Sequence, residues 1–139
     1  MSTLKVNTIQ NTSAAHSSTP EEIAQGRAKA WCNWNGTGTI AIRDSFNVSS
    51  ITDEAAGTTT VTMASAMGNA NYAIAGTAGS SATDAFRVLG AFNTFTTTTF
   101  KVVSQFHGAS PYRFDCELNV VAVFGDQEFF DILKEKTYG

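Results

Sequence analysis

Histidine and cysteine are the side chains from which catalytic centres and zinc sites are often built, and this chain has two of each. His16, His107, Cys32 and Cys116 are far apart in the sequence and fall in no HExxH, CxxC or comparable ligand spacing. A serine or cysteine nucleophile needs a neighbouring base, and the chain has no GxSxG elbow. We therefore expect no catalytic residue, no metal ligand and no cofactor, in a protein that is not an enzyme.

The cysteines are better explained as structure than as chemistry. Cys32 and Cys116 lie on or beside predicted β-strands, and no apolar secretion signal precedes them. We expect two buried, reduced thiols in a protein made in a cytoplasm. A disulfide between them is the alternative.

Aromatic side chains offer a different chemistry, because an exposed ring can stack on a sugar. Trp31 and Trp34 have opposite parity in one predicted strand, so one points inward and the other outward or into an interface, unless a bulge intervenes. The loop 106–113 is rich in groups that a receptor-reading tip uses, although an ordinary loop with one packed aromatic is the alternative. The possible receptor contacts are Trp34, His107, Tyr112 and Arg113.

Composition narrows the class of partner. Charged residues make up 15% of the chain, whereas serine and threonine supply about a fifth of it. Uncharged polar groups cost less to desolvate than ions, so this surface suits a protein with faces buried in an assembly. The net charge of -3 lacks the basic excess of a nucleic-acid-binding protein, and no apolar run approaches the roughly 20 residues that span a bilayer. We expect neither nucleic-acid binding nor membrane insertion.

The elements that must position these side chains are strands. From residue 28 to residue 125, short apolar or β-branched runs are separated by glycine, asparagine, aspartate and serine, which predicts an all-β antiparallel sandwich, jelly-roll-like, of about eight strands. The connecting loops are too short for crossover helices. The predicted strands are Ala28 to Trp34, Gly38 to Arg43, Phe46 to Ile51, Thr58 to Met63, Tyr72 to Thr77, Phe86 to Ala91, Thr98 to Phe106 and Glu117 to Phe124.

Residues 1–27 differ from this domain and form an extended arm. Leu4 and Val6 alternate as in a short strand, with Ile9 one step out of phase, but so few apolar groups need a neighbouring surface. Thr19 followed by proline and two glutamates predicts a short helix that ends at Gly26. We expect the arm to serve attachment and intertwining of identical subunits, through Leu4, Val6 and Ile9.

The last predicted strand is apolar on both faces, and the chain then changes character. Leu118, Val120, Ala122 and Phe124 share one face, yet Val121 and Val123 make the opposite face apolar too, and we assign these two valines to the subunit interface. Residues 126–139 carry acids early and lysines late, which predicts a short C-terminal helix that docks through an apolar stripe.

Two longer stretches resemble a known family. Residues 4–11 (LKVNTIQN) and 26–53, which contain the block WCNWNGTGTIAIRDSFNVSSITD, are similar to small tail-fibre or fibre-like proteins of tailed bacteriophages that infect aquatic bacteria. The resemblance resumes at residues 67–73 and 119–125 and covers most of the chain, which departs from it at Cys32 and in the tail after Gly125. It implies a structural virion protein, commonly a homotrimer, made in the host cytoplasm and placed on the tail or capsid surface. It does not imply an enzyme.

Three functions stay open at this point. The first is a short tail fibre or fibre tip that takes part in host attachment, with other phage virion proteins and a host surface glycan as partners. The second is a capsid cement or decoration protein whose arm reaches across the shell. The third is a carbohydrate-binding module that uses an exposed tryptophan and the loop 106–113.

Overall fold

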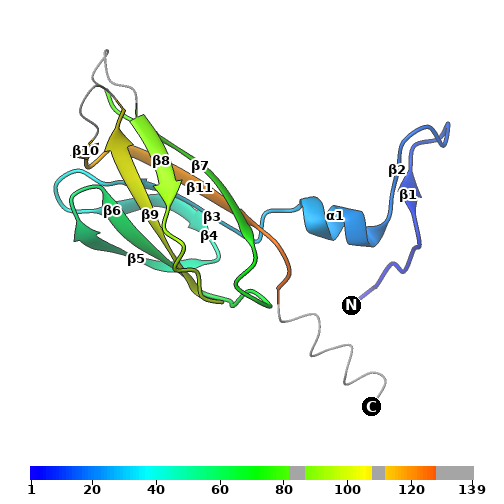
Figure 1. Ribbon diagram of the computed structural model, residues 1–139. Coiled ribbons are helices and arrows are strands. Elements are labelled where there is room, and N and C mark those ends of the chain that lie inside the picture. Colours follow the sequence, from blue (N-terminus) through cyan, green and yellow to red (C-terminus); the bar gives the residue numbers. More distant parts are fainter. Residues whose placement is uncertain (82–86, 108–111, 128–139) are drawn as a thin grey trace.

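The computed structural model describes residues 1–81, 87–107 and 112–127. Figure 1 shows a β-sandwich with an arm that extends from one end of it. The elements are β1 (Ile9–Gln10), β2 (Ser17–Ser18), α1 (Pro20–Gly26), β3 (Ala30–Asn35), β4 (Ala41–Phe46), β5 (Val48–Ala55), β6 (Thr58–Met63), β7 (Ala73–Gly79), β8 (Arg87–Ala91), β9 (Thr99–Phe106), β10 (Tyr112–Arg113) and β11 (Leu118–Phe124).

Two antiparallel sheets face each other in the sandwich. One has the order β4-β3-β11-β7, and the other runs β5-β6-β9-β8. Phe106 pairs with both Arg87 and Tyr112, so β8 and β10 flank β9 on opposite sides. At one side of the sandwich, the edge strands β7 and β8 of the two sheets lie next to each other (Figure 1).

The core follows the period of two that strands impose on side chains. In β3 and β11 every second residue is buried, and β6 and β9 contribute the facing layer. Tyr72 closes the core where β9 begins. Its hydroxyl donates to the carbonyl oxygens of Thr96 and Thr99, each at 2.9 Å, and its ring stacks on the Phe95 ring with the centroids 5.0 Å apart. The largest fully buried side chains are Trp34, Phe100, Met67, Val61, Val102, Val121, Val123, Cys32 and Cys116.

The all-β antiparallel prediction is confirmed, and each of the eight predicted strands overlaps an observed one. The predicted helix is also confirmed, with Thr19 as N-cap and Pro20 as its first residue. The strand orders do not confirm a jelly-roll-like connectivity. Strand β10 and the small sheet of β1 and β2 were not predicted from the sequence.

The remaining two predictions concern the chain ends, a strand at Leu4 and Val6 and a helix over 126–139. The single chain has no strand at Leu4 and Val6, where the expected strand needs a neighbouring surface, and pairing within the arm begins at Ile9, where β1 turns back onto β2. The helix predicted over 126–139 lies outside the described residues from 128 onward. Asp126 and Gln127 are described and pair with residues 67–68, through the Gly68 amide that donates to the Asp126 carbonyl at 2.7 Å.

Candidate functional site

Besides Met1, the arm carries four large apolar side chains that its own chain leaves exposed. The exposed fractions are 84% for Leu4, 38% for Val6, 53% for Ile9 and 45% for Ile23. Leu4, Val6, Ile9 and Ile23 line one open depression of about 540 Å³ together with Pro20. A contiguous apolar surface of this kind normally marks a contact with another macromolecule.

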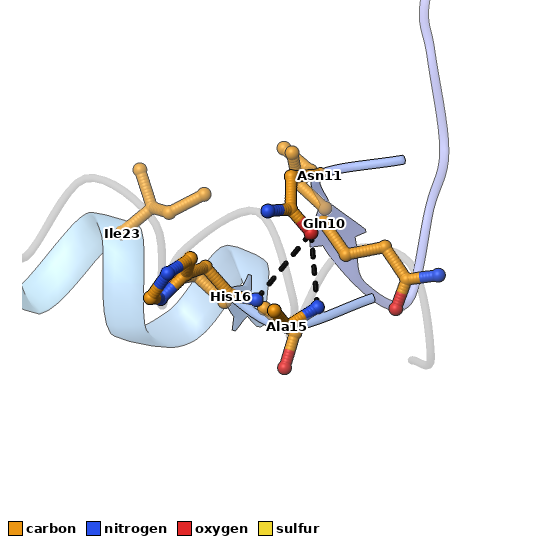
Figure 2. A pocket seen from close by; sticks show the side chains of 8 residues that line it. Gln10, Asn11, Ala15, His16 and Ile23 are labelled. Carbon is orange, nitrogen blue, oxygen red and sulfur yellow. Dashed lines mark hydrogen bonds between the residues drawn. The ribbon is translucent and has the colours of Figure 1, made fainter. Parts of the chain in front are cut away.

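A second depression, of about 740 Å³, lies between the β1–β2 hairpin and α1 (Figure 2). Asn11 holds the turn of the hairpin, because its side-chain oxygen accepts hydrogen bonds from the amides of Ala15 at 2.9 Å and His16 at 3.5 Å. The His16 side chain extends toward α1, which carries Ile23. The Asn11 backbone amide also donates to the His16 backbone carbonyl at 3.1 Å, so these two residues shape the hairpin.

Helix α1 is short but well capped. Thr19 and Glu22 form a capping box, in which the Glu22 amide donates to the Thr19 hydroxyl at 3.2 Å and the Thr19 amide donates to the Glu22 carboxylate at 2.8 Å. A seven-residue helix is marginal without tertiary packing. The cap and Pro20 compensate in part for the missing packing.

The arm joins the sandwich through two side-chain contacts. The buried Lys29 ammonium donates to the carbonyl oxygens of Ala24 and Arg27, and the Gln25 amide donates to the Asp126 carboxylate at 2.6 Å. Burial, and secondarily the charge of Arg27, lower the pKa of Lys29, while Asp126 opposes this shift. These contacts fix the direction in which α1 leaves the sandwich.

Two of the predicted interface residues lie in the core instead. Val121 and Val123 pair with Cys32 and Ala30 and are buried between the sheets, at 1% and 0% exposure. Their assignment to a subunit interface is wrong, because the pleat of β11 turns them inward and turns Val120 outward. Because both faces of β11 are apolar, the sequence did not indicate which face lies toward the core.

Trp34 is likewise not a receptor contact. It is 1% exposed, since β3 points Ala30, Cys32 and Trp34 into the core, and a ring at this depth cannot stack on an external sugar. Trp31 takes the outer face and pairs with Phe46 on β4, which is 55% exposed. The register of β3 and β4 shifts only after Asn33, so the bulge leaves the Trp31 pairing intact.

The tip around β9 and β10 gathers aromatic residues around Tyr112, one of the predicted receptor contacts. Tyr112 is exposed and lies 5.5 Å from the Phe106 ring and 6.1 Å from the Phe114 ring. The Arg87 guanidinium lies over both phenylalanines, at 4.7 Å from Phe114 and 5.4 Å from Phe106. We call Arg87, Phe106, Tyr112 and Phe114 the aromatic tip. An exposed tyrosine on a rigid aromatic and cationic base can stack on a flat ligand face.

The other two predicted receptor contacts fall at the same end. His107 is exposed, and the Arg113 guanidinium lies 5.0 Å from the Phe92 ring. Residues 108–111 of the predicted loop lie outside the described residues. The structure thus brings Tyr112 and Arg113 onto one strand but separates both from Trp34. Arg87 and Phe114 were missed, and only the pairing of β8 and β10 with β9 brings them together.

The thiols take no part in a visible site. Cys32 and Cys116 are free and fully buried. Burial raises the pKa of Cys32 to about 11 and also raises the pKa of Cys116, so both are protonated and poorly nucleophilic near neutral pH. Within the described part of the chain, no three histidine, cysteine, aspartate or glutamate side chains gather closely enough to hold a metal ion. Over the same residues no helix has the length and apolar character needed to cross a membrane.

Comparison with family models, with curated proteins and with solved structures found no match to this chain.

Proposed function

We propose that this chain is a non-enzymatic structural protein of a tailed-phage virion, a short tail fibre or fibre tip that assembles as a homotrimer. The observation that carries the proposal is the arm, whose apolar side chains Leu4, Val6, Ile9 and Ile23 are all exposed. Full burial of an exposed side chain of this type contributes about 1.5–3 kcal/mol, and each of these residues forfeits the share that its exposed fraction represents. An arm of this kind gains its stability from a neighbouring subunit or from the particle.

The aromatic tip supports a role in host attachment. It lies on β8, β9 and β10, and Tyr112 presents its ring to solvent. An outward-facing ring on a rigid sheet is suited to a host surface glycan. In this proposal the arm contacts the virion and the tip contacts the host.

A capsid cement or decoration protein is the alternative that uses the same arm. It differs in location, since the arm would then lie along the capsid shell. A free carbohydrate-binding module is the third possibility, and the aromatic tip is the observation in its favour. That module has no need of the exposed arm residues.

Solution mass separates these functions first. The virion proposal predicts an oligomer by sedimentation, whereas an isolated binding module stays near 14.8 kDa. Deletion of residues 1–25 should leave a folded domain that no longer assembles. Labelled protein on intact particles then distinguishes the tail from the capsid. A wild-type chain that is monomeric and absent from particles would overturn the proposal.

A further inference from the structure

The edge strand β7 lacks the charged residues that the edge strands β4 and β5 carry. Exposed edges usually resist pairing through charges, proline or bulges. The opposite edge β4 contains Arg43 and Asp44, and β5 contains Asp53 and Glu54 and two register shifts. The seven residues of β7, AIAGTAG, include no charge and no proline, and they pair with β11 in an unbroken register.

An apolar slot opens beside this bare edge. It is about 130 Å³ and lies where β7 and β8 meet, between the two sheets. Gly76 lets the two sheets approach closely on one side of the slot, because a Cβ atom there would lie 2.7 Å from the Leu89 side chain and 2.6 Å from the Val120 carbonyl oxygen. Apolar cavities of about 150 Å³ hold a benzene-sized group, so this slot is large enough for one apolar side chain. Its lining is Ile74, Gly76, Leu89, Gly90, Ala91 and Val121.

The same chain contains a segment that suits the edge and the slot. Residues 4–8, LKVNT, adopt no helix or strand, and apolar and polar side chains alternate from Leu4 to Asn7. None of them makes a hydrogen bond to another described residue, and Leu4 and Val6 are exposed. Five extended residues span about 17 Å and the seven of β7 about 23 Å, so the segment fits within the edge.

The contacts of α1 decide which copy supplies the segment. The Lys29 bond to Ala24 and the Gln25 bond to Asp126 direct the arm away from its own sandwich, as Figure 1 shows. Docking onto the chain's own β7 would require the arm to fold back toward the sandwich from which it extends. Docking onto a second copy leaves both contacts in place.

We propose that residues 4–8 of one copy add as a strand to the β7 edge of a second copy, with Leu4 and Val6 on the face toward the slot and the Val6 side chain entering it. Strand addition satisfies free backbone groups of the edge, and alternate side chains fill the adjoining pocket. This inference rests on the proposed function in one respect, namely self-association. It names the surface that receives the arm.

Two arm variants with equal added charge test the donor strand. Val6→Asp places a carboxylate at a position that faces the slot, whereas Asn7→Asp adds the same charge to the next residue, which faces away. We expect Val6→Asp to weaken self-association at least tenfold in sedimentation equilibrium and Asn7→Asp to change it less than twofold. Equal effects of the two variants would overturn the proposed alternation.

The receiving edge is tested by filling the slot from within. Ala91→Leu on β8 extends a side chain into the slot, and Ala41→Leu on the exposed β4 edge is the matched control. We expect only Ala91→Leu to weaken assembly, by a similar factor to Val6→Asp. Thermal melting of both variants separates loss of assembly from loss of folding. If Ala91→Leu proves unfolded, the cross-linking experiment decides the question.

Engineered cysteines identify the copy that donates. A mixture of Val6→Cys chains and Ala91→Cys chains should form an interchain disulfide under mild oxidation, while Asn7→Cys with Ala91→Cys should form far less. The native thiols do not interfere, because both are buried. A Val6→Cys, Ala91→Cys double variant that links only within one chain would overturn docking between copies. An oligomer that persists in all variants would overturn this inference but not the proposed function. A monomeric wild-type chain would contradict both.

Discussion

The Lys29 ammonium donates a hydrogen bond to the Ala24 carbonyl, and so the first buried residue of the sandwich caps the last turn of the arm helix. It also donates to the Arg27 carbonyl at 3.3 Å. A cation at a helix C-terminus meets the negative end of the dipole and satisfies a carbonyl that the helix itself leaves free. The Lys29 side chain therefore links the direction of the arm to the folded sandwich.

Replacement of Lys29 should release the arm while the sandwich stays folded. Lys29→Met keeps the length of the side chain and removes a buried charge, so we expect little change in melting temperature. The Arg27 carbonyl loses its donor, and trypsin should cut after Arg27 several times faster. Lys101→Met on β9 is the control and should leave the cleavage rate unchanged. Equal rates in both variants would show that Lys29 does not hold the arm.

Thr19→Ala should weaken the arm alone. Loss of an N-cap hydroxyl costs about 1 kcal/mol of helix stability. Since α1 contributes no buried residue, the melting temperature of the sandwich should not change. Amide exchange in α1 should accelerate about fivefold, the factor that corresponds to about 1 kcal/mol. Exchange that accelerates in β3 as well would mean that arm and sandwich unfold together.

Trp34 and Trp31 should behave as a buried and a partly exposed tryptophan. Trp34→Ala should cost about 3–5 kcal/mol, because it opens a large cavity in the core. Trp34→Phe should cost less, since the indole N–H has no hydrogen-bond partner among the described residues. Iodide should quench the fluorescence of a Trp34→Phe chain, which reports Trp31, more strongly than that of a Trp31→Phe chain. The reverse order is incompatible with the observed pleat of β3.

Tyr112→Ala should remove glycan binding without changing stability. Tyr112 is 54% exposed and forms the outermost ring of the aromatic tip. Phe46→Ala removes an equally exposed ring on the opposite sheet and serves as the control. We expect at least a tenfold loss of adsorption to host polysaccharide for Tyr112→Ala and none for Phe46→Ala. Unchanged adsorption in both variants would exclude the tip as the receptor contact.

The free energy of unfolding should fall at alkaline pH, because the folded chain buries a thiol and a phenol in their protonated forms. The pKa of Cys32 is raised by burial from 9.0 to about 11, so between these values the unfolded chain has lost a proton that the folded chain retains. Stability is therefore full below pH 9 and falls as pH rises toward 11, by at most about 1.4 kcal/mol per pH unit for this group. Burial likewise raises the pKa of Tyr72 to about 12. Urea unfolding at pH 8 and pH 10 should show the loss, and Cys32→Ala should reduce it.

The strands and the arm helix were predictable because each depends on the pattern of residues within its own short segment. Period-two runs between turn residues indicated eight of the sandwich strands but not β10, and Thr19 and Pro20 marked the start of α1. The exposure of Leu4 and Ile9 also followed from the sequence, since an arm with so few apolar groups has nothing of its own to bury them against. These features depend on neighbours in the chain.

Which face of a strand is inner, and which strands form the edges, was decided only by the tertiary structure. Val121 and Val120 are equally apolar, as are Trp34 and Trp31, and only the partner sheet buries one of each pair. The bare edge of β7, the slot at Gly76 and the stacking of Arg87 on Phe114 all join residues distant in sequence. A sequence pattern fixes the period of a strand but not its phase relative to a layer, because the phase is set by the packing of the two sheets.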